Sequence, residues 1–451
     1  MFRELPRYAS TRRTTLPWAV DIPSHWQVGR AKSIMRALDV RSADGEEELL
    51  TVSSSRGVVP RASAQVNMFK AESYAGHKLC WPGDLVINSL WAWGRGLGVA
   101  RHHGIVSTAY GVYRQRGKAL NAEYLHQLVR SEPFQWELQV RSQGVWKSRL
   151  QITDDRWLDA PLLVPAHEEQ AAIVKYLAHA NARISKAIAA KARLIALLEE
   201  QATAQARELF SANRHDDAPF VPLKRLVATR GGMTPSKDDH AYWGGDVPWV
   251  SPKDVKSGVL HDSIDHITQT ALEQTSISLV PKGAVVIVVR GMILARTVPV
   301  AILGVDSTLN QDMKALVPRE GKLKSEYLRD WLRVHEAEVL ELVETAGHGT
   351  KKLDTDALMN VRVAVPSLAI QESLSARIAS EGATTRVAAT RARSEITLLQ
   401  EFRTRLIADV VTGQVDVRAI AASLPDTPEQ DTELDSLLDD DVEDMLGEGE
   451  E

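Results

Sequence analysis

The chain is poor in the features that mark secreted and membrane proteins. It contains a single cysteine, Cys80, in 451 residues. An internal disulfide framework is therefore excluded, which fits a reducing compartment. The first residues lack the apolar stretch of a secretory signal. The longest apolar runs, such as residues 284–289, are far shorter than the roughly 20 residues that span a bilayer. We therefore expect a cytoplasmic protein, long enough to fold into two or more domains.

Several catalytic motifs are also missing. No Asn-Pro-Pro or Asp-Pro-Pro sequence of an adenine methyltransferase occurs, and no GxxxxGK[ST] phosphate loop. The glycines at 94, 96 and 98 lack the spacing of a dinucleotide loop. Asp254, followed by Lys256, is the nearest fragment of a nuclease site, but it has no second carboxylate for Mg²⁺. No cysteine or acid lies at metal-ligand spacing from His102, His103, His261 or His266. We predict no catalytic, cofactor-binding or metal-binding residue.

Acidic residues are concentrated at the end of the chain. Thirteen Asp and Glu and no Lys or Arg lie between residues 424 and 451. The rest holds 54 basic and 46 acidic residues, so the net charge of −5 conceals a body of about +8. A mildly basic body suits a polyanionic partner. We predict that residues 419–451 form a disordered, solubilising tail, and a role in screening the basic surface from non-specific DNA stays open.

An internal repeat organises the sequence. Residues 164–170, VPAHEEQ, return as VPSLAIQ at residues 365–371, an offset of 201 that persists downstream. Upstream the offset drifts, since Tyr124 aligns with Tyr327 at 203. A constant offset through a long stretch indicates a rigid helix without insertions, whereas drift is typical of loops.

Each repeat ends in a segment with a helical pattern. From Ile173 to Leu198 apolar residues recur mostly at three- and four-residue steps, and no Pro or Gly interrupts residues 167–210. The second copy runs from about Gln371 to Gly413, a natural helix terminator. The apolar seam is narrow, so each helix needs a partner, and the other copy is the economical one. The first helix would be a rod of roughly 66 Å.

The segments before the helices contain short β-rich runs, such as residues 85–88 and 285–289, punctuated by Gly, Pro and Asp. We predict an α/β (α+β) fold with two similar mixed α/β domains, separated by two long antiparallel coiled-coil helices in a pseudo-two-fold repeat. The predicted boundaries are 1–160 for the first domain, 161–212 for the central helix, 213–364 for the second domain and 365–418 for the C-terminal helix.

Several motifs give this layout a family resemblance. The first domain carries IPSHWQVGR (22–30) and PGDLVINSLWAWGRGLGVARHHGIVSTAYGVYR (82–114). The second carries GGMTPSKDDHAYWGGDVPWVSPKDV (231–255), VVRG (288–291), LNQD (309–312) and GHGTKKL (347–353). The helix signatures are EEQAAIVKYL (168–177) and LLQEFRTRLIADVVTGQVDVR (398–418). From residue 16 to about 418 the chain resembles the specificity subunits of type I restriction–modification enzymes. It departs from that family at Ile370, where the second copy usually has Glu before Gln.

The resemblance implies a non-catalytic, sequence-specific DNA-binding subunit. Its two target recognition domains would each read one half of an asymmetric, bipartite duplex site, with the long helices as spacers. Two methyltransferase subunits would join it to direct adenine methylation, and motor-nuclease subunits would add ATP-dependent restriction. No cofactor is expected in this chain, because S-adenosylmethionine, ATP and Mg²⁺ would belong to the partners. Half-sites on one duplex face lie roughly 34–36 Å apart, a spacing that a rod of this length can set.

The candidate DNA contacts are of two kinds. Phosphates are bound by cations and N–H donors on loops, which favours Thr350, Lys351 and Lys352, with Lys147 and Arg149 at the similar place in the first domain. Base edges are read by Arg, Asn, Gln and hydroxyl groups. The candidate readers are Thr234, Ser236, Lys237, Arg290, Asn310 and Gln311 in the second domain and Arg56, Arg95, Arg101, Ser107 and Tyr110 in the first. The alternative for each is an ordinary loop residue, and Asn310 with Gln311 would then shape a turn.

Two other functions stay open. A non-DNA assembly scaffold would leave the basic loops unexplained and would show no salt-sensitive DNA binding. A free-standing nuclease would cleave with Mg²⁺ alone. The large aromatics beside the short strands, Trp91, Trp93, Trp243 and Trp249, are predicted to be core rather than stacking platforms.

Overall fold

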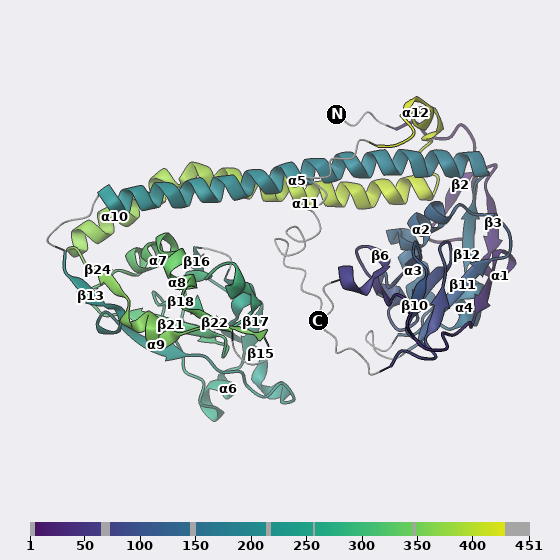
Figure 1. Cartoon of the computed structure of the whole chain (residues 1–451). Helices are drawn as coiled ribbons and strands as arrows, with labels where there is room; N and C mark the ends of the chain where they lie inside the picture. The colour runs from purple at the N-terminus through teal and green to yellow at the C-terminus, as the bar shows by residue number, and fades with distance from the viewer. Residues whose placement is uncertain are drawn as a thin grey trace. The chain divides into compact units, whose positions relative to one another are not determined.

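The computed structural model describes residues 5–64, 73–144, 150–212, 218–255, 258–345 and 349–428. These residues divide into two units. Unit 1 comprises the described residues up to 190 and those from 394 to 428, and unit 2 comprises those from 191 to 393. Each unit combines one α/β domain with parts of the long helices (Figure 1).

Unit 1 is built on a four-stranded antiparallel sheet in the order β4-β11-β8-β9. Its strands are β4 (Met35–Leu38), β8 (Leu85–Asn88), β9 (Leu97–Val99) and β11 (Tyr110–Gln115). The paired strands outside it are β1 (Thr11–Arg13) with β2 (Asp21–Pro23), β3 (Gln27–Arg30) with β12 (Pro161–Val164), β5 (Leu50–Ser53) with β6 (Gly57–Pro60), and β7 (Lys78–Cys80) with β10 (Gly104–Val106). The short helices are α1 (Ala31–Ile34), α2 (Ala122–Arg130), α3 (Glu132–Arg141) and α4 (Asp154–Leu158). The Asn121 side chain caps α2 by accepting from two backbone N–H groups.

Unit 2 has a five-stranded sheet in the order β14-β21-β18-β19-β16, antiparallel except for the β16–β19 pair. Its strands are β14 (Val227–Gly231), β16 (Val259–Leu260), β18 (Val285–Val288), β19 (Val300–Leu303) and β21 (Met313–Pro318). The other strands are β15 (Trp243–Val250), β17 (Asp265–Ile267) and β20 (Thr308–Leu309) in a three-stranded sheet, and the pairs β13 (Phe220–Pro222) with β24 (Arg362–Ala364) and β22 (Val343–Thr345) with β23 (Lys351–Leu353). The short helices are α6 (Gln269–Gln274), α7 (Ser325–Val334), α8 (Glu336–Leu340) and α9 (Thr355–Asn360).

Strands β8 and β18 hold equivalent positions in the two sheets, because each lies between two antiparallel partners. Val86 on β8 pairs with Gly98 and Val112, and Val286 on β18 pairs with Ala301 and Ala315. Both valines are fully buried, as are their β-branched and aliphatic neighbours on these strands. The two-domain repeat predicted from the sequence is therefore present in the strand register, and the mixed α/β fold class is confirmed.

The long helices are α5 (His167–Ala212), α10 (Leu368–Glu381) and α11 (Ala383–Val411), followed by the short α12 (Arg418–Ser423). Figure 1 shows α5 and α11 side by side. In unit 1 Arg403 donates to Ser185 Oγ over 2.8 Å, and in unit 2 Arg393 forms an ion pair with Glu199. The repeat copies are therefore packing partners, as the narrow apolar seam predicts.

The second long helix differs from its prediction in one respect. Gly382 ends α10 before α11 begins, whereas the sequence pattern suggested one helix from about Gln371 to Gly413. Glycine is a poor helix former, and the backbone entropy lost at Gly382 favours a break there. Gly413 has a φ of 74°, the left-handed conformation that commonly ends a helix. The predicted end of α11 is thus confirmed.

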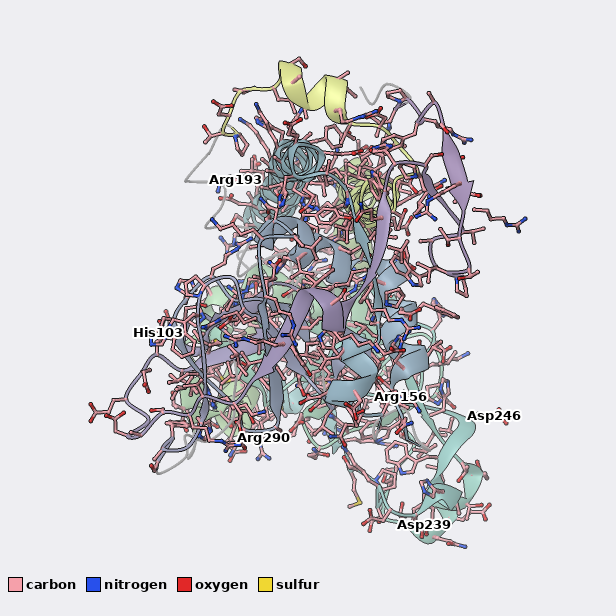
Figure 2. All side chains as sticks on the ribbon, turned by 90° about the vertical axis from the view of Figure 1, so that its right-hand side faces the viewer. His103, Arg156, Arg193, Asp239, Asp246 and Arg290 are labelled. Carbon is pink, nitrogen blue, oxygen red and sulfur yellow. The ribbon has the colours of Figure 1, made fainter. Side chains whose placement is uncertain are left out.

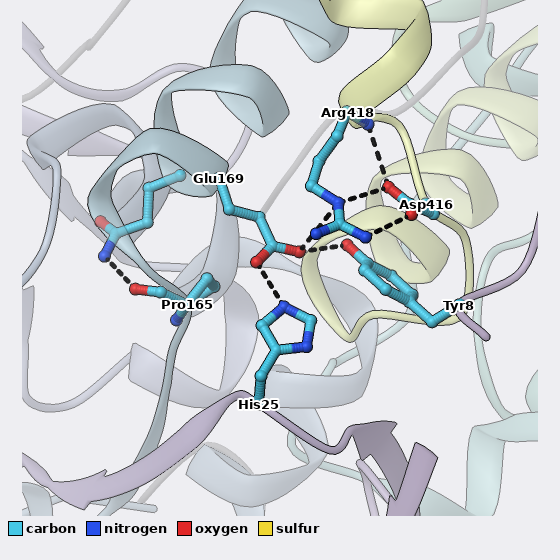
Figure 3. A network of polar contacts seen from close by, with 7 residues as sticks. Tyr8, His25, Pro165, Glu169, Asp416 and Arg418 are labelled. Carbon is cyan, nitrogen blue, oxygen red and sulfur yellow. Dashed lines mark hydrogen bonds and ion pairs between the residues drawn. The ribbon is translucent and has the colours of Figure 1, made fainter. Parts of the chain in front are cut away.

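A buried carboxylate joins the first and last parts of unit 1 (Figure 3). Glu169, at the start of α5, accepts from Tyr8 Oη over 2.6 Å and lies 2.7 Å from His25 Nε2. Arg418 lies over the Tyr8 ring and forms an ion pair with Asp416 over 2.7 Å. Burial, with the hydrogen bond to Glu169, raises the pKa of Tyr8 above its usual value. At the corresponding place in the second repeat stands Ile370, which lacks a carboxylate to make such contacts.

Candidate nucleic-acid interface

In unit 2 the loop after β14 is tied to the turn after β20. Met233 N donates to Leu309 O over 2.8 Å, and Thr234 Oγ1 hydrogen-bonds Gln311 Oε1 across 77 residues of sequence. Gly232 runs so close to this turn that a Cβ there would lie 1.8 Å from Asn310 O. Only glycine allows such an approach, so the two predicted segments form one surface.

Asn310 shapes this turn from inside. Its side chain is 6% exposed, and its Oδ1 accepts from Asp312 N over 3.1 Å. Its own N–H donates to Val250 O over 2.9 Å. The neighbouring Gln311 is exposed. Of the two candidates, Gln311 is therefore the one whose side chain lies within reach of a ligand.

The backbone of Asp312 joins this surface to the turn after β18. Its carbonyl accepts from Val289 N over 2.8 Å and from Arg290 N over 3.3 Å. Arg290 in turn forms a β-bridge with Lys352. Both basic side chains are exposed (Figure 2 labels Arg290).

Four predicted segments thus meet at one border of unit 2. We call residues 232–234, 289–293, 310–312 and 350–352 the unit 2 edge. Within it Gly291 N donates to Lys351 O over 3.0 Å, and Lys351 Nζ donates to Thr345 Oγ1 over 2.9 Å. Thr350 is half-buried. The edge offers cations, hydroxyl groups and an amide, the donors that phosphates and base edges accept from.

The remaining candidates of unit 2 lie outside the unit 2 edge, on the loop that follows residues 232–234. Ser236 and Lys237 are exposed. The carbonyl of Ser236 accepts from Trp243 Nε1 over 3.0 Å, so an aromatic ring supports the loop. Trp249 is 7% exposed, as predicted for a core residue, whereas Trp243, Trp91 and Trp93 are only half-buried.

In unit 1 one half-buried arginine holds two candidate loops together. Arg130, the last residue of α2, donates to the carbonyls of Ser53, Ser54 and Ser55 in the β5–β6 turn and of Arg95 and Leu97 after β8. Burial and the nearby charge of Arg95 lower the pKa of Arg130 to about 10, so it stays cationic at neutral pH. A lone arginine at the end of a short helix forms no distinctive sequence pattern, so the sequence does not predict this role of Arg130.

Two candidates lie on the loops that Arg130 connects. Arg56 is half-buried and donates to Ser63 O over 2.5 Å. Arg95 has a φ of 65° and donates to Gln135 Oε1 over 3.2 Å. Left-handed backbone is costly for a residue other than glycine, so the surrounding contacts must hold this loop in one conformation.

Arg101, Ser107 and Tyr110 lie on the strands and turns that follow. Arg101 is exposed and forms a 2.8 Å ion pair with Glu123, a surface contact that a phosphate can replace at little cost. The Ser107 carbonyl accepts from Tyr110 N over 3.0 Å. Burial raises the pKa of Tyr110, whose backbone pairs with Asn88 at the start of the loop that carries Arg95. Lys147 and Arg149 lie outside the described residues.

The described parts of the chain contain no group of three or more His, Cys, Asp or Glu residues arranged to hold a metal ion. Among the helices within those parts, none is both long and apolar enough to cross a membrane.

Two repeated α/β domains with paired long helices define a class of architecture, and comparison with known proteins shows which proteins share its features. Residues 216–389 match the model of the type I restriction modification DNA specificity domain. This segment of the chain is therefore similar to the specificity subunits of type I restriction–modification systems.

Two curated relatives and one solved structure illustrate the similarity. The type I restriction enzyme EcoR124I/EcoR124II specificity subunit of Escherichia coli is 34% identical over 169 residues, which are 37% of this chain and 42% of that protein. The MjaIX specificity subunit of Methanocaldococcus jannaschii is 32% identical over 123 residues, 24% of this chain and 28% of that protein. The matches thus span less than half of either relative's length. A chain from a structure of complex assembly and conformational transition in a type I restriction–modification system aligns over 87% of this chain and 99% of its own length. Its TM-score is 0.53 at 16% identity, which supports a shared fold.

Proposed function

We propose that this chain reads an asymmetric, bipartite sequence in duplex DNA for a type I restriction–modification complex. Unit 1 reads one half of the site and unit 2 the other. The chain itself performs no chemistry; it directs adenine methylation by partner subunits and ATP-dependent restriction when motor-nuclease subunits join.

The observation that carries this proposal is the unit 2 edge. Segments 232–234, 289–293, 310–312 and 350–352 are far apart in the sequence, yet backbone hydrogen bonds and the Thr234–Gln311 contact connect them. The edge combines the exposed cations Arg290 and Lys352 with the exposed amide of Gln311. Cations bind phosphates, and an amide or a guanidinium reads base edges. Such a mixture favours a DNA-reading surface over a purely structural one.

The partners are inferred from the family. Two methyltransferase subunits would supply S-adenosylmethionine, and motor-nuclease subunits would supply the sites for ATP and Mg²⁺. An adenine inside a duplex must leave the base stack before a methyltransferase can reach it. The reading subunit therefore has to hold the duplex while a partner flips the base.

Two alternatives make different predictions. An assembly scaffold would bind its protein partners but would show no salt-sensitive affinity for DNA. A free-standing nuclease would cleave DNA with Mg²⁺ in the absence of partners.

The deciding experiment is single-molecule methylation sequencing of cells that carry the chain with its neighbouring methyltransferase, against cells that lack only this chain. A split motif with methyladenine in both halves, present only with the chain, supports the proposal and reveals the sequence read. If methylation is unchanged while the methyltransferase still co-purifies with the chain, the scaffold is favoured. A palindromic motif would contradict the asymmetric reading.

A further inference from the structure

Both units expose large apolar side chains at the same turn of the fold. The turn follows β8 in unit 1 and β18 in unit 2, strands that have equivalent partners in the two sheets. Leu90 is 51% exposed in the first turn, and Met292 and Ile293 are 63% and 40% exposed in the second. Isolated exposed apolar residues are common on proteins. Their recurrence at one place in two domains of different sequence calls for a shared cause.

The turn of unit 1 is built to hold Leu90 in place. Leu90 N donates to Asn88 Oδ1 over 3.2 Å, and Leu90 O accepts from Trp93 Nε1 over 3.2 Å. The Trp91 ring packs against Gly94 in the same turn, since a Cβ on Gly94 would lie 2.3 Å from Trp91 Nε1. A turn fixed at so many points presents Leu90 without the entropy loss that ordering a mobile loop would carry.

The turn of unit 2 also holds exposed apolar side chains in place, but it does so with different residues. Gly291 begins it with a φ of 136° and is bonded through N–H to Lys351 O over 3.0 Å. Leu294, 1% exposed, anchors the following short helix, Met292–Ala295, in the core. Met292 and Ile293 therefore project while Leu294 packs inward. The exposed cations Arg290 and Lys352 lie beside them on the unit 2 edge.

In unit 2 the apolar group is flanked by cations, which fits a ligand that offers both negative charge and apolar surface. Duplex DNA offers phosphates outside and base faces inside, and apolar side chains are known to enter between base pairs and unstack them. Resting on the function proposed above, we infer that Leu90 and Met292, the latter supported by Ile293, are wedges. Each opens the base stack within the half-site that its unit reads, and so lowers the cost of moving the target adenine out of the stack.

The test uses the full chain and duplexes carrying the motif found by methylation sequencing, with 2-aminopurine placed at each adenine position in turn. The fluorescence of this base rises when it is unstacked. We expect the intact chain to raise fluorescence at one position in each half-site. Leu90→Ala should abolish the rise in one half and Met292→Ala in the other, each with affinity weakened by roughly tenfold from lost apolar burial.

Matched variants separate the wedge from other effects. Leu194→Ala removes an α5 leucine that is 45% exposed and should change neither signal. Leu90→Met keeps an apolar side chain and should retain the rise in fluorescence. Circular dichroism checks that each variant is folded.

The outcomes are distinct. If the intact chain binds the motif in a salt-sensitive way but no 2-aminopurine brightens, the wedge is wrong and DNA reading stands. The wedge is equally wrong if Leu90→Ala weakens binding while the fluorescence rise persists, because Leu90 would then contact a thymine methyl in the groove. If the chain shows no salt-sensitive binding to duplex DNA, that result contradicts the proposed function itself.

Discussion

Gln170 and Gln371, 201 positions apart, make the same three hydrogen bonds. Both side chains are fully buried. In each, Oε1 accepts from the backbone N–H of the residue before a helix, and Nε2 donates to two carbonyls. The bonded groups are Asn121 N, Ala119 O and Pro165 O for Gln170, and Lys324 N, Lys322 O and Pro366 O for Gln371. The glutamine of the repeated motif thus joins the start of a long helix to the domain before it.

Replacing either glutamine should destabilise the fold. Gln170→Ala or Gln371→Ala leaves one backbone N–H and two carbonyls without their partner, which should lower the free energy of unfolding by about 2–4 kcal/mol. Gln201→Ala, at an exposed position of α5, is the control and should change it by less than about 0.5 kcal/mol. Urea unfolding followed by circular dichroism measures both. Equal stability of all three variants would mean that the repeated glutamine is not structural.

A second prediction concerns pH. His126 on α2 accepts from Val99 N over 3.3 Å. Burial and then the neighbouring Arg130 lower the pKa of His126 to about 4 from 6.5. The unfolded chain therefore takes up a proton near pH 6.5, while the folded chain does so only near pH 4. Between these values the unfolded state binds more protons, so stability falls as the pH is lowered, by on the order of 1–3 kcal/mol from this group.

The comparison with His126→Gln isolates this contribution. The variant removes the titrating ring while the carboxylates of the chain titrate as before. The difference in unfolding free energy between the intact chain and the variant should favour the intact chain most at pH 7 and shrink toward pH 4.5. A difference that is constant across this range would contradict a neutral, buried ring.

The sequence predicts most reliably those features that depend on neighbouring residues or on an internal repeat. The helical seam, the helix end at Gly413 and the two-domain repeat follow from spacing alone and are confirmed. The break at Gly382 is harder to foresee, because a single glycine within a helical pattern is often tolerated. The meeting of Thr234 with Gln311 and of Arg290 with Lys352 depends on tertiary packing, since 77 residues separate the first pair and 62 the second. The role of Arg130 cannot be predicted from the sequence, because its partners are backbone carbonyls, which no sequence pattern marks.

The cations of the unit 2 edge give a third prediction. Removing a phosphate contact weakens DNA binding uniformly across sequences and lowers the slope of log Kd against log salt by about 1. We expect this of Lys352→Ala. Arg290→Ala should instead weaken binding to the cognate motif more than to other DNA if its guanidinium reads guanine, by roughly 1–3 kcal/mol.

Salt titrations on cognate and scrambled duplexes distinguish the two roles. Arg377→Ala, on α10 of the same unit and paired with Glu381, removes a cation outside the edge and serves as the control. If all three variants behave alike, the edge is only part of a diffuse basic surface.

The last prediction concerns the distance between the two half-sites. If α5 and α11 together act as the spacer, adding four residues to each, one helical turn, preserves their antiparallel packing and lengthens the pair by about 6 Å. With base pairs about 3.4 Å apart along the duplex, the gap in the recognised sequence should grow by one or two base pairs while both half-sites stay the same. The added turns belong after Ala190 in α5 and before Ser394 in α11, the positions at which the two units divide. Methylation sequencing of cells carrying the lengthened chain reads the gap directly. A motif with changed half-sites, or an unchanged gap with methylation intact, would mean that the helices do not set the spacing.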